Sequence, residues 1–359
     1  MIRVLVVEDS RVSREWIIHV LQSDPEIEVI GFAENGREAV EFVARDKPDL
    51  ITMDICMPEM DGFEATRRIM EMNPVPIIML TEQPEMRELE TSFSAIDVGA
   101  LLVVKKPPGL GHPEQAQAAK ELIRMVKLMA EIRVVRRRMR AFEEKNSCQR
   151  EAESWATEKW QAIRVLGIGA STGGPPVIQK ILAEMPSDFP LPILIVQHMA
   201  RGFTEGFVEW LGKTAALPVQ LAANGGDIRA GQVYVAPDGL QMKVDGNNHL
   251  ICREEMSMHG LSPSVSYLFQ SLALHYGAAA MGILLTGMGK DGAAELALMK
   301  KAGALTIAQD RESSIVFGMP GEAVRLNGAS YVLPPERIVL LLKKIAEDVQ
   351  RKGEAACRR

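Results

Sequence analysis

Residues 164–176 read Arg-Val-Leu-Gly-Ile-Gly-Ala-Ser-Thr-Gly-Gly-Pro-Pro, an apolar run followed by a glycine-rich turn that carries one serine. This order predicts a buried strand, a sharp turn at Ser171 and a helix that begins near Pro175 and Pro176, because proline is well tolerated in the first turn of a helix. The G-x-S-x-G spacing exposes a serine hydroxyl beside the free N–H groups of a helix start. Such a serine can be a nucleophile, or it can only cap the helix.

The same glycines allow a second interpretation, a dinucleotide-binding turn. That motif requires an acidic residue at the end of the next strand, about 20 residues further on, to bind the ribose. The next apolar run, residues 191–198, ends in His198 instead. A histidine cannot accept hydrogen bonds from two ribose hydroxyls, but it can take a proton from Ser171. The sequence therefore favours a hydrolase over a dinucleotide-binding protein.

A second glycine-rich turn, residues 286–292, also follows an apolar run and contains Asp291. Aspartate in this position most often caps the next helix. With Ser171 and His198, however, Asp291 would complete a triad of nucleophile, base and orienting carboxylate. The order Ser-His-Asp disfavours an ordinary α/β-hydrolase, in which the acid precedes the histidine. The alternative bases are His259 and His275.

The composition is that of an ordinary globular protein, with 359 residues, 47% hydrophobic and 25% charged, enough for two or three domains. A net charge of −6 gives no electrostatic reason to expect a nucleic-acid partner. The four cysteines form no C-x-x-C pair, which indicates neither a disulfide framework nor a zinc site. Without a signal peptide or an apolar run long enough for a membrane span, we expect a cytoplasmic protein that does not insert into a membrane.

The first 110 residues alternate apolar strands with amphipathic helices, which predicts a doubly wound parallel sheet. Ligands of such sheets bind at the carboxyl ends of the strands. The polar residues that follow the predicted strands are Glu8, Asp9, Asp54, Thr81 and Lys106. Three converging carboxylates repel one another, so we expect a Mg²⁺ site. A carboxylate beside Mg²⁺ can attack a phosphoryl donor, and the lysine and the hydroxyl can hold the phosphate.

Residues 8–10, 53–62, 80–81 and 106–107 resemble a response-regulator receiver domain, which has a flavodoxin-like fold. The resemblance implies Asp54 as the phosphoacceptor, and it also implies a cis peptide bond before Pro107. The implied Mg²⁺ ligands are Glu8, Asp9, Asp54 and the backbone carbonyl of Cys56. The implied phosphate-sensing residues are Thr81 and Lys106. Val103 departs from the family, which often carries an aromatic switch residue at this position.

The second half again alternates strands and helices, which predicts a second doubly wound, Rossmann-like domain over residues 161–350. Residues 233–236 and 241–244 are expected to form a small β insertion in it. Residues 1–128 would form the receiver, and residues 129–160, which contain no glycine or proline, a helical or partly disordered linker.

Residues 168–175, 196–199, 202–204 and 285–293 resemble the protein-glutamate methylesterase domain of chemotaxis pathways. The resemblance implies a phosphorylation-regulated enzyme of sensory adaptation. It would hydrolyse glutamyl methyl esters on methyl-accepting chemoreceptors, with deamidation of glutamines as a related activity. A histidine kinase would supply the phosphoryl group, and the ester chemistry would need no cofactor. We expect a monomer.

The resemblance assigns Ser171 as nucleophile, His198 as general base and Asp291 as the carboxylate that orients it. The implied oxyanion hole consists of the backbone N–H groups of Thr172 and Met288. Ser266 departs from the family, which commonly has aspartate there, and we expect this change to affect a helix start rather than the chemistry.

Two other classes of protein are alternatives. An inactive docking module would not need the intact triad residues. A receiver-linked transcription factor would need a basic helix-turn-helix domain, which residues 161–350 do not provide.

Overall fold

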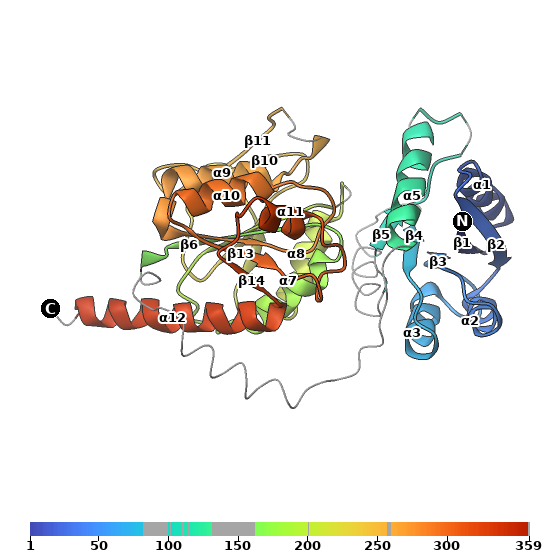
Figure 1. The fold of residues 1–359 in the computed structure, drawn as a ribbon, viewed down its shortest axis with the longest axis horizontal. Coiled ribbons are helices and arrows are strands. Elements are labelled where there is room, and N and C mark those ends of the chain that lie inside the picture. Colours follow the sequence, from blue (N-terminus) through green and yellow to red (C-terminus); the bar gives the residue numbers. More distant parts are fainter. Residues whose placement is uncertain are drawn as a thin grey trace. The chain divides into compact units, whose positions relative to one another are not determined.

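The computed structural model describes residues 1–81, 100, 102–109, 111–113, 115–130, 162–199, 201–256 and 260–357. The chain divides into two compact units, residues 1–138 and 139–359 (Figure 1). The linker predicted over 129–160 lies almost entirely outside the described residues, so the domain boundaries stay a prediction. No helix among the described residues is both long and apolar enough to span a membrane.

The first unit contains a five-stranded parallel sheet with the flavodoxin-like order β2-β1-β3-β4-β5. Its strands are β1 (Ile2–Val7), β2 (Ile27–Ala33), β3 (Leu50–Asp54), β4 (Ile77–Thr81) and β5 (Leu102–Lys105). Its described helices are α1 (Arg11–Gln22), α2 (Gly36–Arg45), α3 (Gly62–Met72) and α5 (Gln115–Ala130). Helix α1 packs with α5 on one face of the sheet, and α2 packs with α3 on the other (Figure 1).

Short polar side chains start the helices of this unit directly after the strands. The side chains of Ser10, Asn35 and Asp61 each accept a hydrogen bond from a backbone N–H in the first turn of α1, α2 and α3.

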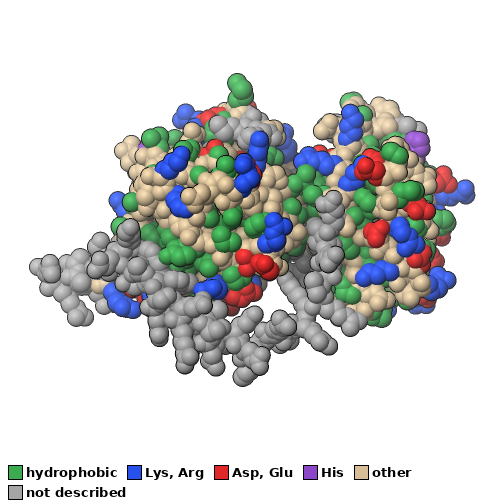
Figure 2. Space-filling model, in the orientation of Figure 1, with side chains coloured by type: hydrophobic (Ala, Val, Ile, Leu, Met, Phe, Trp, Pro, Cys, Tyr) green, Lys and Arg blue, Asp and Glu red, His purple; other side chains and the backbone are tan. Residues whose placement is uncertain are grey.

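The peptide bond before Pro107 is trans, so the cis bond implied by the resemblance is wrong. The chain is held at this point by a hydrogen bond from Lys106 N to Thr81 O of 2.7 Å. On the face shown in Figure 2, basic and acidic side chains of this unit are interspersed.

The second unit contains a seven-stranded parallel sheet of order β14-β13-β12-β6-β7-β9-β8. Its strands are β6 (Val165–Ala170), β7 (Ile193–Gln197), β8 (Val219–Leu221), β9 (Val233–Val235), β12 (Ala280–Leu284), β13 (Leu305–Gln309) and β14 (Tyr331–Leu333). A separate antiparallel hairpin consists of β10 (Gln241–Val244) and β11 (Leu250–Arg253).

Helices cover both faces of this sheet. One face carries α9 (Val265–His275), α10 (Ala293–Lys301) and α11 (Met319–Arg325) (Figure 1). The short 3-10 helix η3 (Gly277–Ala279) lies between α9 and β12 in the chain. The other face carries α7 (Gly174–Ala183), α8 (Thr204–Gly212) and α12 (Pro335–Cys357) (Figure 1). Two doubly wound α/β sheets are therefore present, as the sequence predicts.

The predicted β insertion is partly wrong. Strand β9 pairs with β7 and β8 in the main sheet, and only residues 241–244 belong to the separate hairpin. A strand of three residues carries too little periodicity to show which sheet it joins. Its partner in β7 lies about 40 residues away along the chain.

The glycines of β6 let helix α9 lie directly on the centre of the sheet. A Cβ at Gly169 would lie 2.3 Å from Val265 Cγ1, and a Cβ at Gly167 would lie 2.5 Å from Leu272 Cδ1. Both neighbouring side chains are completely buried in the core of the unit. Close helix packing thus accounts for the G-x-G spacing without a bound dinucleotide.

Candidate active site

The three predicted triad residues lie at the carboxyl ends of three neighbouring strands. Ser171 directly follows β6, His198 directly follows β7, and Asp291 lies in the turn between β12 and α10. The strand pairing continues past the strand ends. Ser171 N donates to Thr286 O at 3.0 Å, and His198 N donates to Ala170 O at 2.9 Å. These bonds hold the three segments level at one edge of the sheet.

His198 and Asp291 are in direct contact. His198 Nε2 lies 2.8 Å from Asp291 Oδ2, and the two side chains are 10% and 1% exposed. An ionised carboxylate can only accept, so the proton of the neutral imidazole is on Nε2. Nδ1 is then the nitrogen with a free lone pair. In chymotrypsin-like proteases the two ring nitrogens have the opposite roles.

Asp291 also caps a helix, but not the helix that follows it. Its carboxylate accepts hydrogen bonds from Ser264 Oγ at 2.7 Å, Val265 N at 2.6 Å, and Ser266 N and Oγ at 3.2 and 2.7 Å, all at the start of α9. Helix α10 is capped instead by Gly292, with no side-chain hydrogen bond. The interpretation of Asp291 as a simple cap of its own helix is therefore wrong.

These contacts explain the acidity of Asp291. Burial raises its pKa, but hydrogen bonds from His198, Ser264 and Ser266 outweigh burial and lower the pKa from 3.8 to about 2. The positive end of the α9 dipole acts in the same direction. A stable anion thus faces His198.

Ser171 lies in a tight turn and does not cap α7. The helix is capped by Gly173, whose φ of 77° is left-handed, without a side-chain hydrogen bond. From the opposite side, a Cβ at Gly287 would lie only 2.7 Å from Ser171 Cβ. The alternative interpretation of Ser171 as the cap of α7 is therefore wrong.

Gln197 links the nucleophile segment to the base segment, a role that the sequence analysis missed. Its Nε2 donates to Ser171 O at 2.9 Å and to His198 O at 2.8 Å, and the residue is 4% exposed. The one signal in the sequence is a polar residue at the end of an otherwise apolar strand. Gln197 therefore positions two segments of the site at once.

The predicted oxyanion donors lie on the two turns that meet beside Ser171. Thr172 O accepts a hydrogen bond from Thr286 Oγ1 at 3.0 Å, while the N–H of Thr172 has no partner within the described part of the chain. Met288 follows Gly287, whose carbonyl accepts bonds from the start of α11. This placement suits the predicted role of Thr172 and Met288, which stays a prediction.

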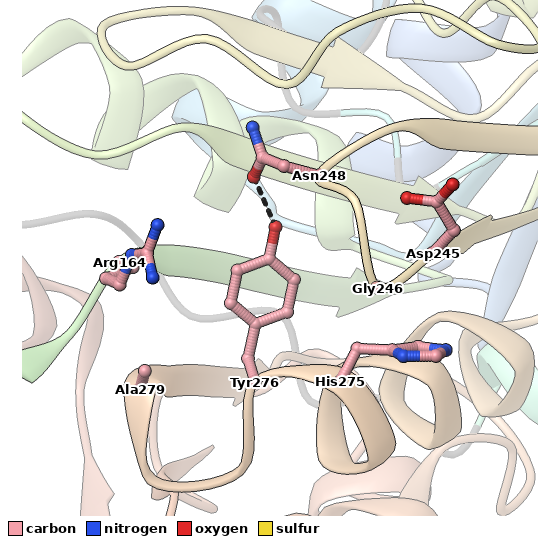
Figure 3. Close-up of a pocket in the computed structure, with 7 residues that line it drawn as sticks. All are labelled: Arg164, Asp245, Gly246, Asn248, His275, Tyr276 and Ala279. Carbon is pink, nitrogen blue, oxygen red and sulfur yellow. Dashed lines mark hydrogen bonds between the residues drawn. The ribbon is translucent and has the colours of Figure 1, made fainter.

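The alternative base His275 lies far from this edge of the sheet. It is the last residue of α9, is exposed, and lines a cavity of about 150 Å³ together with Arg164 and Tyr276 (Figure 3). Arg164 precedes β6, whereas Ser171 follows it, so this cavity lies at the opposite end of the strand. The other alternative base, His259, lies outside the described residues.

The polar strand ends of the first unit also converge. Ligand oxygens of Glu8, Asp9 and Asp54 lie within 4.8 Å of one another. Lys106 Nζ lies 2.9 Å from Glu8 Oε2 and 3.0 Å from Asp54 Oδ1. These residues, with Thr81 and Cys56, line a cavity of about 220 Å³. The structure therefore brings together every residue that the sequence placed in this site.

The charges of this cavity fit a divalent cation. Burial raises the pKa of both Glu8 and Asp54, although Lys106 acts in the opposite direction. Glu8 Oε2 is buried and, within the described residues, accepts no hydrogen bond despite its ion pair with Lys106. A cavity lined by several carboxylate oxygens suits a hard cation such as Mg²⁺.

Comparison with known proteins gives a matching family for each of the two compact units. The family model described as CheB methylesterase matches residues 166–342, and the one described as response regulator receiver domain matches residues 4–117. A protein-glutamate methylesterase/protein-glutamine glutaminase of Syntrophus aciditrophicus (strain SB) is 50% identical over 349 residues, covering 97% of this chain and 99% of the relative. The corresponding protein of Nitrosospira multiformis is 48% identical, covering 99% of each.

Among solved structures, the CheB methylesterase catalytic domain of Thermotoga maritima is 34% identical, with a TM-score of 0.48, and covers 52% of this chain and 98% of that one. The relatives match over nearly their whole length, and in this chain the receiver match precedes the methylesterase match. The chain therefore belongs to the protein-glutamate methylesterase/protein-glutamine glutaminase family.

Proposed function

We propose that this chain hydrolyses glutamyl methyl esters on methyl-accepting chemoreceptors, and that phosphorylation of Asp54 activates it. The observation that carries the esterase proposal is the buried His198–Asp291 contact at the strand ends beside Ser171. The relatives named for methylesterase and glutaminase activity support the substrate class. In a cell, the reaction would reset the modification state of the receptors during sensory adaptation.

The proposed acylation uses the lone pair of His198 Nδ1. Ser171 Oγ attacks the ester carbonyl carbon as its proton passes to Nδ1, and a tetrahedral oxyanion forms. The N–H groups of Thr172 and Met288 would stabilise this oxyanion. His198 then returns the proton to the departing methoxide, so that methanol leaves and an acyl-Ser171 ester remains. Asp291 stabilises the positive charge that His198 carries in between.

Deacylation repeats these steps with water as the nucleophile. His198 Nδ1 takes a proton from water, the hydroxide attacks the acyl carbon, and the proton goes to Ser171 Oγ as the glutamate carboxyl is released. A glutamine amide would pass through the same acyl-enzyme with ammonia as the first leaving group, which connects the two activities in the relatives' names.

In the receiver, Asp54 Oδ2 is the oxygen that suits attack on a phosphoryl group. Oδ1 is held by Ile55 N at 2.8 Å and by Lys106 Nζ at 3.0 Å. Lys106 and Thr81 would hold the new phosphoryl oxygens, and a histidine kinase would be the donor. Glu8, Asp9, Asp54 and the carbonyl of Cys56 would hold Mg²⁺, which when bound offsets the negative charge of the carboxylates and the phosphoryl group.

The esterase proposal is tested by methanol release from membranes that carry methylated receptors. We expect release with the wild-type chain and none above background with Ser171→Ala. The matched control is Ser187→Ala, which removes an exposed hydroxyl from the same unit and should release methanol at the wild-type rate. Methanol release by Ser171→Ala at a rate comparable to wild type would remove Ser171 from the mechanism.

A further inference from the structure

The hydroxyl of Ser266 lies between two carboxylates. Its Oγ is 2.7 Å from Asp291 Oδ1 and 2.7 Å from Glu295 Oε2, and it accepts a hydrogen bond from Gly292 N at 3.0 Å. The residue is 1% exposed. Because a hydroxyl carries one hydrogen, it can donate to only one of two ionised carboxylates at a time. Glu295 and Asp291 therefore compete for the same hydrogen.

The competition for the Ser266 hydrogen affects how strongly Asp291 attracts His198, the proposed base. His198 from the end of β7 and Glu295 from α10 are the titratable groups in contact with this cluster in the described residues, and the start of α9 contributes only hydroxyl and N–H groups. Each hydrogen bond that Asp291 accepts from α9 spreads its negative charge away from the imidazole. A carboxylate with fewer donors attracts a protonated histidine more strongly.

We propose that Ser266 is a positioning residue of the triad, and that its single hydroxyl hydrogen couples the His198–Asp291 contact to the ionisation of Glu295. An ionised Glu295 shares the hydrogen with Asp291, whereas a neutral side chain at this position leaves the hydrogen with Asp291. The inference rests on the proposed function, because it assigns His198 as the base.

Substitutions at the two positions should shift the pH dependence in opposite directions. The acidic limb of kcat/KM reports protonation of the base in the free enzyme. Ser266→Ala removes a donor from Asp291, so the limb should move to higher pH by about half a unit. We expect kcat to fall about tenfold with KM unchanged, because the buried Ser266 does not reach the substrate. Glu295→Gln removes the competitor, so the limb should move to lower pH.

A double-variant cycle separates this coupling from a direct charge effect. Removing the charge of Glu295 would also favour neutral His198 through space, without Ser266. The coupling predicts that Glu295→Gln causes no further shift in a Ser266→Ala background, whereas a direct effect would persist there. Glu209→Gln, which removes an exposed carboxylate from α8, is the matched control and should leave the limb unchanged.

The ¹⁵N signals of the His198 ring, titrated in the folded full-length variants, give the same comparison without turnover. Opposite shifts in the two single variants, with a double variant that titrates as Ser266→Ala does, would support the proposal. An unchanged titration in folded Ser266→Ala, or a Glu295→Gln shift that persists in the double variant, would overturn it. If Ser266→Ala does not fold, Ser266→Cys, whose thiol is a weak donor, replaces it. If the wild-type chain releases no methanol but the His198 signals of the variants still shift in this way, the proposed function fails and the coupling is supported.

Discussion

Replacing Asp291 with asparagine tests how the carboxylate supports the base, because the amide must point its NH₂ group toward one of two sets of donors. In one orientation the NH₂ faces Val265 N and His198 Nε2, which lie 2.6 and 2.8 Å from Oδ2. In the other it faces Ser266 N at 3.2 Å and two serine hydroxyls that can turn to accept. The second orientation loses only the longest bond, so we expect the introduced amide to adopt it.

In that orientation the amide oxygen still accepts from His198 Nε2, and Nδ1 keeps its lone pair. The loss is then the attraction between the carboxylate and the protonated imidazole. For charge centres about 4 Å apart at an effective dielectric constant of about 20, this attraction is about 4 kcal/mol, an upper limit of about 10³ in rate. We expect kcat to fall by about 10² to 10³. One buried N–H that meets another should lower the free energy of unfolding by about 1–3 kcal/mol.

Methanol release gives kcat, urea unfolding gives the stability, and the ¹⁵N signals of the His198 ring identify the protonated nitrogen. A kcat within about threefold of wild type would refute the role of Asp291. A change of tautomer would refute the orientation, and the loss of kcat would then approach about 10⁴, as in the corresponding protease variant.

Three further predictions follow from the same contacts. Gln197→Glu replaces the amide that donates to the backbone carbonyls of Ser171 and His198 by a carboxylate that repels them. We therefore expect kcat to fall at least about tenfold. A wild-type kcat would contradict the positioning role of Gln197. Gly169→Ala puts a methyl group 2.3 Å from Val265 Cγ1 and should lower the free energy of unfolding by about 1–3 kcal/mol. Adding Val265→Ala makes room for this methyl group and should restore part of the lost stability. A double variant with no restored stability would contradict the packing argument. Asp291 has a pKa of about 2 when folded and an ordinary value of 3.8, so the native state binds fewer protons in this range. Its stabilising contribution is complete above pH 4 and decreases by about 2 kcal/mol as the pH falls through 2. Urea unfolding should show that the free energy of unfolding falls less over this pH range in Asp291→Asn than in wild type. Equal losses in the two proteins would contradict the stabilising contribution of the Asp291 carboxylate.

Much of the architecture follows from local sequence patterns. Near-continuous apolar runs such as residues 193–197 mark buried parallel strands, and residues directly after such runs meet at one edge of a sheet. Ser171, His198, Asp54 and Lys106 were predictable for this reason. The short strands β8 and β11 were not predicted, because three or four residues carry too little periodicity.

Contacts between segments distant in sequence were the harder part. Asp291 caps a helix whose first turn lies about 26 residues earlier in the chain, and no local pattern indicates that pairing. For the same reason, Ser266 was expected to act only on a helix start. The structure shows that it also donates to Asp291. Gln197 was overlooked because its two bonds go to backbone carbonyls, which any sequence supplies.

The most direct test of a phosphorylation-regulated serine esterase is methanol release with and without a small-molecule phosphodonor. The account predicts that the donor increases release by the wild-type chain, that Asp54→Asn shows only the unstimulated rate, and that Ser171→Ala shows neither. Glu71→Gln, which removes an exposed carboxylate from the same unit, should respond to the donor as wild type does. Release from the wild type that ignores the donor, or stimulation that persists in Asp54→Asn, would contradict the account.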